Sequence, residues 1–146
     1  MKTIEFETAK KLKELGITPI LKYQMTWYKI GETRVLSETF NQLNCNKGYI
    51  LIGAALTLDE ILDMLPVRIE TNYAYYFVNL DKYPDKDKIS SYCICYVRNN
   101  LLDDKSVLKE FTHANPAEVA GQLLIWCIEN GHVKIEDINN DCTNVE

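Results

Sequence analysis

Two cysteines stand one residue apart in the segment SYCICY, residues 91–96. Such a pair could form a disulfide, ligate a metal ion or simply belong to a strand. In a strand, Cys93 and Cys95 share one face and lie about 7 Å apart, whereas the Cβ atoms of a disulfide are about 4 Å apart. The spacing therefore argues against a disulfide between these two thiols.

A structural zinc site usually needs about four ligands, so this cysteine pair would require two more. The remaining candidates are isolated in the sequence: Cys45, Cys127, Cys142, His113 and His132. Free cysteines usually behave as small buried hydrophobic residues. We therefore expect core packing, free thiols, no metal site and no cofactor. An odd number of cysteines without regular spacing also indicates a reducing compartment such as the cytoplasm.

Catalysis by a cysteine nucleophile requires a histidine within hydrogen-bond reach. Cys127 lies among apolar residues of a helix-like segment, and a buried thiol has a raised pKa and low reactivity. A catalytic role is therefore not expected. A small enzyme with a Cys/His or carboxylate/His site is the alternative, and it requires His113 or His132 beside a cysteine or carboxylate in a cleft.

Acidic residues gather in two segments that have the composition of loops. Asp81, Asp85 and Asp87 alternate with lysines in the first segment, and Asp103 and Asp104 lie in the second. Neither segment has the alternating ligands, central glycine and distal glutamate of a calcium-binding loop. We expect solvated, charged turns at both places.

Most of the nine tyrosines fall in segments that alternate with a period of two. Residues 73–80 and 90–98 are apolar on both alternating faces, although a sheet covered by helices on one side needs only one apolar face. Aromatic residues are enriched at protein interfaces, but they also favour strands for packing alone. The candidate interface consists of Tyr73, Tyr75, Phe77, Tyr92, Ile94 and Tyr96.

Three segments have the periodicity of amphipathic helices: residues 8–16, 57–66 and 115–131. Thr8 is the expected N-cap of the first, and a capping box opens the second. The third has an asparagine cap, a proline at its first position and a glycine stop. Its polar side includes Glu118, which we therefore expect to face solvent.

Strand-like segments occupy residues 22–30, 34–36, 72–80, 90–98 and 107–113. Residues 40–55 are either an irregular connection or a buried strand. The order of these segments predicts an α+β fold, with an antiparallel sheet of about four to six strands and three helices, the C-terminal one packed across the sheet. We expect one domain over residues 1–138 and a mobile tail over residues 139–146.

The formal net charge of −5 opposes non-specific binding of nucleic acid. A single-stranded nucleic-acid binder is a second alternative, and it requires Lys22, Arg68 and Arg98 to converge on the aromatic face. The longest apolar run, YILIGAAL, is far shorter than the ~20 residues that span a bilayer. The N-terminal residues have no apolar signal region. The sequence therefore predicts a soluble, cytoplasmic protein without a membrane partner.

Two helix-like segments, TLDEILDMLP and PAEVAGQLLIWCIENG, enclose the tyrosine-rich strands. This arrangement resembles the small uncharacterised phage- and prophage-type proteins of gut Bacteroidetes, over roughly residues 57–133. The resemblance implies an accessory protein of a mobile element and carries no catalytic residues. We therefore expect a small non-catalytic accessory or interaction protein, whose aromatic sheet face contacts a partner protein or a second copy.

Overall fold

The computed structural model describes residues 2–18, 22–39, 48–84, 90–98 and 106–140. The helices are α1 (Phe6–Leu15), α2 (Leu58–Met64), α3 (Pro116–Glu129) and α4 (Ile135–Asn140). The strands are β1 (Met25–Ile30), β2 (Thr33–Glu38), β3 (Ile50–Ala54), β4 (Arg68–Glu70), β5 (Tyr75–Pro84), β6 (Ser90–Arg98) and β7 (Ser106–His113). They form an α+β fold, as predicted. In the described part of the chain, no helix has the length and apolar character needed to cross a membrane.

The smaller sheet has the strand order β2-β1-β3, and all its pairs are antiparallel. β1 and β2 form a hairpin, and Gly31 at its turn has a φ of 57°, a conformation that suits glycine. The ambiguous stretch before α2 contains the strand β3, while residues 40–47 lie outside the described part. α1 packs on this sheet so closely that a Cβ at Gly53 would lie 2.5 Å from the carbonyl oxygen of Ala9.

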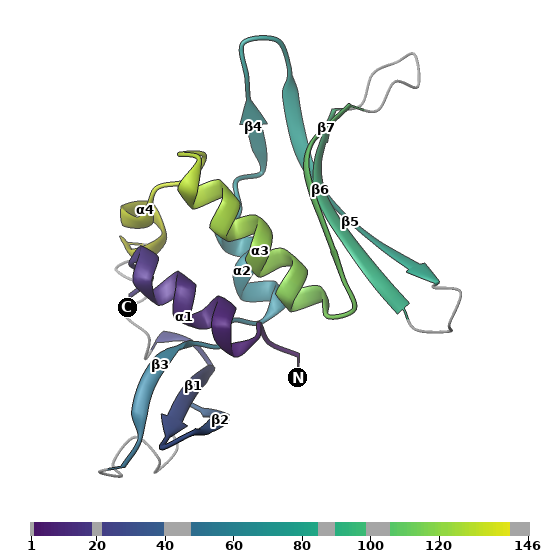
Figure 1. The fold of residues 1–146 in the computed structure, drawn as a ribbon. Helices are drawn as coiled ribbons and strands as arrows, with labels where there is room; N and C mark the ends of the chain where they lie inside the picture. Colours follow the sequence, from purple (N-terminus) through teal and green to yellow (C-terminus); the bar gives the residue numbers. More distant parts are fainter. Residues whose placement is uncertain (1, 19–21, 40–47, 85–89, 99–105, 141–146) are drawn as a thin grey trace.

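The larger sheet has the order β4-β5-β6-β7, again with antiparallel pairs. Figure 1 shows the helices gathered between the two sheets, with α3 lying along one side of β6 and β7. The predicted packing of the C-terminal long helix against the sheet is therefore confirmed. The opposite side of β5, β6 and β7 carries no described helix.

One buried cluster joins residues from both sheets and from the helices between them. Ala54 of the smaller sheet, Ile94 of the larger sheet, and Leu124 and Cys127 of α3 all belong to it. Cys127 is fully buried there as a free thiol, so the predicted core packing of this cysteine is confirmed. The described residues contain no group of three or more acidic, cysteine or histidine side chains that could hold a metal ion.

The start of α1 and the polar side of α3 differ from the predictions. α1 begins at Phe6 with Glu5 at the N-cap, so Thr8 is inside the helix and caps nothing. The Thr8 hydroxyl instead donates to Oε2 of Glu118 over 2.7 Å. Glu118 is buried, and its predicted exposure is wrong because α1 covers this side of α3. The Glu118 carboxylate also accepts from the Glu5 backbone N–H at 2.9 Å and from Gln122 Nε2 at 3.0 Å.

Two short elements, β4 and α4, have no counterpart among the predicted segments. α4 continues to Asn140 and so includes the first residues of the segment expected to be a mobile tail. The Asn139 side chain accepts from the Thr18 N–H at 2.9 Å and donates to the Gly16 carbonyl at 2.8 Å. These bonds tie α4 to the end of α1. Residues 141–146 lie outside the described part of the chain.

Candidate functional site

The six predicted interface residues do not share one face of the sheet. The register pairs Phe77 with Val97 and Leu80 with Ile94, so odd-numbered residues of β5 and β6 point to one side and even-numbered residues to the other. Ile94 and Tyr96 are fully buried in the core beneath α3. The prediction of a common face is therefore wrong for these two residues and for Tyr92, which packs against the same core.

Tyr75 and Phe77 lie on the side away from the helices, and each side chain is 48% exposed. Tyr73 precedes β5 and is 92% exposed. We call the side away from the helices the outer face. It consists of Tyr75, Phe77, Asn79, Asp81 and Tyr83 of β5, Cys93, Cys95 and Val97 of β6, and Val107 and Glu110 of β7.

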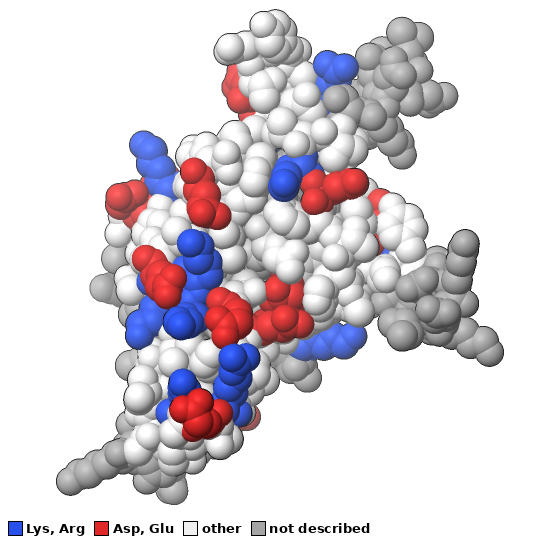
Figure 2. Space-filling model, viewed as in Figure 1, with Lys and Arg blue, Asp and Glu red and all other residues white. Residues whose placement is uncertain are grey.

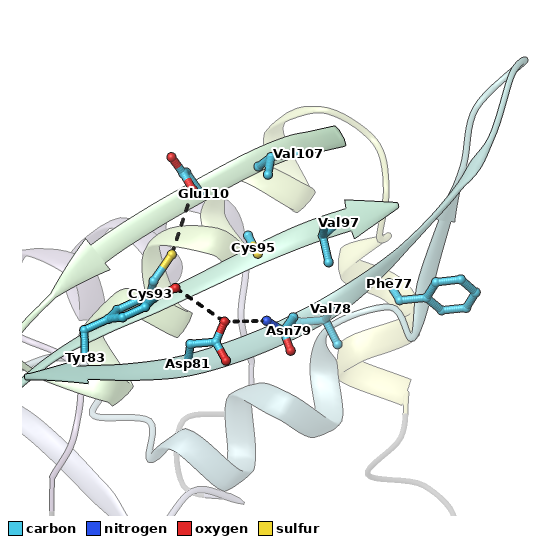
Figure 3. Close-up of a pocket in the computed structure, with 10 residues that line it drawn as sticks. All are labelled: Phe77, Val78, Asn79, Asp81, Tyr83, Cys93, Cys95, Val97, Val107 and Glu110. Carbon is cyan, nitrogen blue, oxygen red and sulfur yellow. Dashed lines mark hydrogen bonds between the residues drawn. The ribbon is translucent and has the colours of Figure 1, made fainter. Parts of the chain in front are cut away.

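The outer face contains a hollow of about 310 Å³. Figure 3 shows it spread across three strands, with Cys93 and Cys95 in the middle strand and the helices behind the sheet. Both thiols are 8% exposed and form the floor, whereas Tyr83 and Val107 at the margins are 49% and 45% exposed. The hollow therefore has a sulfur-lined floor and an apolar, partly aromatic margin.

Asp81 and Glu110 are the charged residues of this hollow. Asp81 was expected in a loop, but β5 continues to Pro84 and places it in the strand beside Cys93. Its Oδ2 accepts from Asn79 Nδ2 at 2.7 Å and from the Tyr83 hydroxyl at 3.5 Å. Oε2 of Glu110 lies 3.9 Å from Sγ of Cys93, which donates to it. Asp85, Asp87, Asp103 and Asp104 lie outside the described residues.

The two thiols on the floor are poor nucleophiles. Burial is the main cause that raises the pKa of Cys93 and Cys95, and the carboxylates of Glu110 and Asp81 raise both values further. The charge of Asp81 also raises the pKa of the Tyr83 hydroxyl. Both thiols consequently stay protonated at neutral pH, which does not favour cysteine chemistry here.

Neither histidine lines this hollow. The backbone N–H of His132 donates to the Cys127 carbonyl at 2.9 Å, at the end of α3. Nδ1 of His113 accepts from the Asn115 N–H at 2.9 Å, and Nε2 lies 3.4 Å from Oε1 of Glu5. The His132 ring instead packs on Trp126 at a centroid distance of 4.8 Å. His113 and Glu5 therefore form a His–carboxylate pair of the kind that the enzyme alternative requires. Neither residue lines the outer-face hollow or the hollow between β7 and α3.

The three cations named for nucleic-acid binding do not converge. Lys22 donates to the Ile138 carbonyl at 3.5 Å, near α4. Arg68 lies 4.8 Å from the centroid of the Tyr75 ring at the β4 side of the outer face. Arg98 has an even number in β6 and so points to the helix side. Figure 2 shows acidic and basic groups intermingled over the helices rather than gathered by sign.

A second, more apolar hollow of about 240 Å³ lies between β7 and α3. It is lined by Lys109, Phe111, Gln122, Ile125, Trp126 and Glu129. The Lys109 ammonium lies 5.1 Å from the centroid of the Phe111 ring, and Glu129 lies 4.0 Å from Lys11. The charged groups at its margin therefore already have partners within the chain.

Comparisons with protein-family models, with curated proteins and with solved structures found no match. The resemblance to phage- and prophage-type proteins accordingly stays a prediction from the sequence.

Proposed function

We propose that this chain is a small, non-catalytic interaction protein that binds another protein through the outer face of β5, β6 and β7. The observation behind this proposal is that Phe77, Tyr83 and Val107, each 45% to 49% exposed, line a hollow that no described helix covers. Tyr75, on the same face, is 48% exposed. Contiguous exposed apolar surface on a soluble domain is characteristic of interaction sites. Tyrosine and phenylalanine are also enriched at the centres of such interfaces.

The proposed function is still contact with a partner through an aromatic sheet face, as predicted from the sequence, but three of the six predicted interface residues are no longer part of it. Tyr73, Tyr75 and Phe77 stay in the candidate interface, while Tyr92, Ile94 and Tyr96 leave it because they support the core. The buried free thiols of the described part support a reducing, cytoplasmic location. An accessory role in a mobile element rests on the sequence resemblance alone.

A different protein fits the outer face better than a second copy does. In a symmetric dimer the same surface patch meets itself across a two-fold axis. Asp81 and Glu110 would then face the same two carboxylates of the other copy, and like charges across an interface are repulsive. We therefore expect light scattering to show a monomer across a concentration series. A dimer that is lost on Phe77→Ser substitution would instead identify a second copy as the occupant.

Site-specific photocrosslinking tests the proposal directly. Benzoylphenylalanine placed at Val107 reports on the outer face, and the same group at Ile50, which is 62% exposed on β3, serves as the matched control. We expect a defined crosslinked partner from position 107 in extracts of the producing cells, and none of that product from position 50. The same product should disappear when Phe77→Ser is combined with the probe.

Two results would reject the docking function. Crosslinks of equal yield from both positions would indicate non-specific contact. A product from Val107 that survives Phe77→Ser would show that the aromatic residues do not contribute to binding.

A further inference from the structure

The hollow on the outer face carries two negative charges that no described cation neutralises. Its lining residues include Asp81 and Glu110 but neither lysine nor arginine. The hydrogen-bond partners of these two carboxylates are uncharged: Asn79, Tyr83 and the thiol of Cys93. Carboxylates with only neutral partners on a binding surface favour a partner that supplies positive charge.

The nearest described lysines along the strands are directed away from this hollow. Lys82 follows Asp81 in β5, so it points to the helix side, where its ammonium lies 5.7 Å from the centroid of the Tyr92 ring. Lys109 precedes Glu110 in β7 and likewise lies over the Phe111 ring. In β5 and β7 the alternation of side chains thus puts these two lysines on the helix side and Asp81 and Glu110 on the outer face. The described cation on that face is Arg68 of β4, which lies over the Tyr75 ring and does not line the hollow.

The two carboxylates approach the same thiol from opposite sides. The register places Asp81 opposite Cys93 on β5, and Thr112 of β7 opposite Cys93 on the other side. Glu110 pairs with Cys95, two residues further along β6, but its carboxylate lies within 3.9 Å of the Cys93 sulfur. Burial is the main cause of the raised pKa of both thiols, and the nearby charges of Glu110 and Asp81 add to it.

An aromatic ring stands beside this negative site. Tyr83 is 49% exposed, and its hydroxyl is hydrogen-bonded to Asp81, so the ring borders the acidic end of the hollow. A cation that meets a carboxylate can therefore also contact an aromatic face. The volume of about 310 Å³ is at the low end for ligand pockets and admits a single long side chain.

We propose that the hollow between Asp81 and Glu110 receives an arginine or lysine side chain of the partner protein, while apolar neighbours of that residue cover Phe77 and Val107. Arginine fits best, because its planar guanidinium pairs with carboxylates and stacks on aromatic rings. This inference rests on the proposed docking function and adds the chemistry of the partner.

The test uses two synthetic peptides that differ in one charge. Both have capped ends and a leucine on each side of the central residue, which is arginine in one and its neutral analogue citrulline in the other. Titrations of the ¹⁵N-labelled full chain are followed by NMR at low salt. We expect the arginine peptide to shift the amide signals of Cys93, Cys95 and Glu110, and to bind roughly tenfold more tightly than the citrulline peptide.

Matched variants separate a local effect from the general charge of the protein. Asp81→Asn with Glu110→Gln removes two negative charges from the hollow. Glu14→Gln with Asp63→Asn removes two from exposed positions on α1 and α2. We expect the first pair to reduce binding of the arginine peptide to the citrulline level and the second pair to leave it within about twofold.

Each other outcome overturns a stated part of the inference. Equal binding of both peptides at the outer face would show that the hollow does not select a cationic side chain. The proposed docking function would be unaffected by that result. No binding of either peptide would overturn the inference, while the crosslinking from Val107 still decides the docking function separately. Binding of N-acetylarginine amide as tight as that of the peptide would assign the site to a small organic cation instead of a protein.

Discussion

Cys127 and Tyr96 link the middle of α3 to β6 in the core. Burial raises the pKa of Cys127 from 9.0 to about 12, and the Tyr96 hydroxyl lies beside it. That hydroxyl donates to the Pro66 carbonyl at 2.6 Å, which also holds the residues after α2 against the sheet. At the residue scale, these two side chains are structural, although Tyr96 was predicted to contact a partner.

The Cys127 thiol should make stability depend on pH in the alkaline range. Because its pKa is higher in the folded chain than in the unfolded chain, the stabilisation is complete below pH 9 and is lost as the pH rises towards 12. We expect this thiol to lower the free energy of unfolding by about 1 kcal/mol between pH 8 and pH 10. Urea unfolding monitored by circular dichroism at both pH values measures the change.

Cys127→Ala provides the comparison for this prediction. The variant should be less stable at both pH values because it leaves a cavity, but its stability should fall less between them. The difference between the two pH dependences gives the contribution of the Cys127 thiol to the free energy of unfolding. It is thereby separated from the contributions of other groups that lose a proton at high pH. An identical fall in both proteins would contradict the raised pKa of Cys127.

At the scale of elements, the buried carboxylate of Glu118 joins α3 to the start of α1. It accepts hydrogen bonds from the Glu5 N–H, the Thr8 hydroxyl and the Gln122 amide. Glu118→Ala would leave the first two donors without this acceptor inside the protein. We expect a loss of about 3 kcal/mol in the free energy of unfolding, measured with urea at pH 7.

Glu129→Ala is the matched control, since it removes a glutamate from the same helix at an exposed position. Glu129 has only a 4.0 Å contact with Lys11, so its loss should cost under about 0.5 kcal/mol. Similar losses for the two variants would show that the Glu118 hydrogen bonds do not hold α1 against α3.

At the scale of the whole molecule, two tryptophans report on different parts of the fold. Trp27 lies in β1 of the smaller sheet, where its Nε1 donates to the Ile4 carbonyl at 2.9 Å. Trp126 lies on α3, against the larger sheet. The predicted single domain requires the two environments to be lost together, since one buried cluster connects both sheets.

Single-tryptophan variants test this cooperativity. Trp27 is the only tryptophan in Trp126→Phe, and Trp126 is the only one in Trp27→Phe, so excitation at the red edge of the tryptophan band reports on one site at a time. We expect the fluorescence and far-ultraviolet circular dichroism midpoints in urea to coincide within each variant. Comparison within one variant removes any effect of the substitution on overall stability. Midpoints that separate by more than the fitting error would indicate two independently unfolding parts.

Local patterns determined the secondary structure wherever the physical cause was local. The capping box of α2 is present, with Thr57 Oγ1 accepting from the Glu60 N–H and the Glu60 carboxylate accepting from the Thr57 N–H. Gly16 and Gly131 adopt the positive φ expected after a helix. β6 and β7 also lie where the period of two predicted them, whereas β5 spans Tyr75–Pro84 instead of the predicted residues 72–80.

The sequence by itself thus determined the fold class, the three longer predicted helices and the interior position of Cys127. It left open which side of β6 is inside, because that strand is apolar on both faces and the period of two fixes only which residues share a side. The pairing register and the position of α3 decided this and buried Ile94 and Tyr96. The same tertiary contacts buried Glu118 and brought Asp81, Glu110 and the two thiols together, since residues distant in the chain become neighbours only when strands pair and helices cover them.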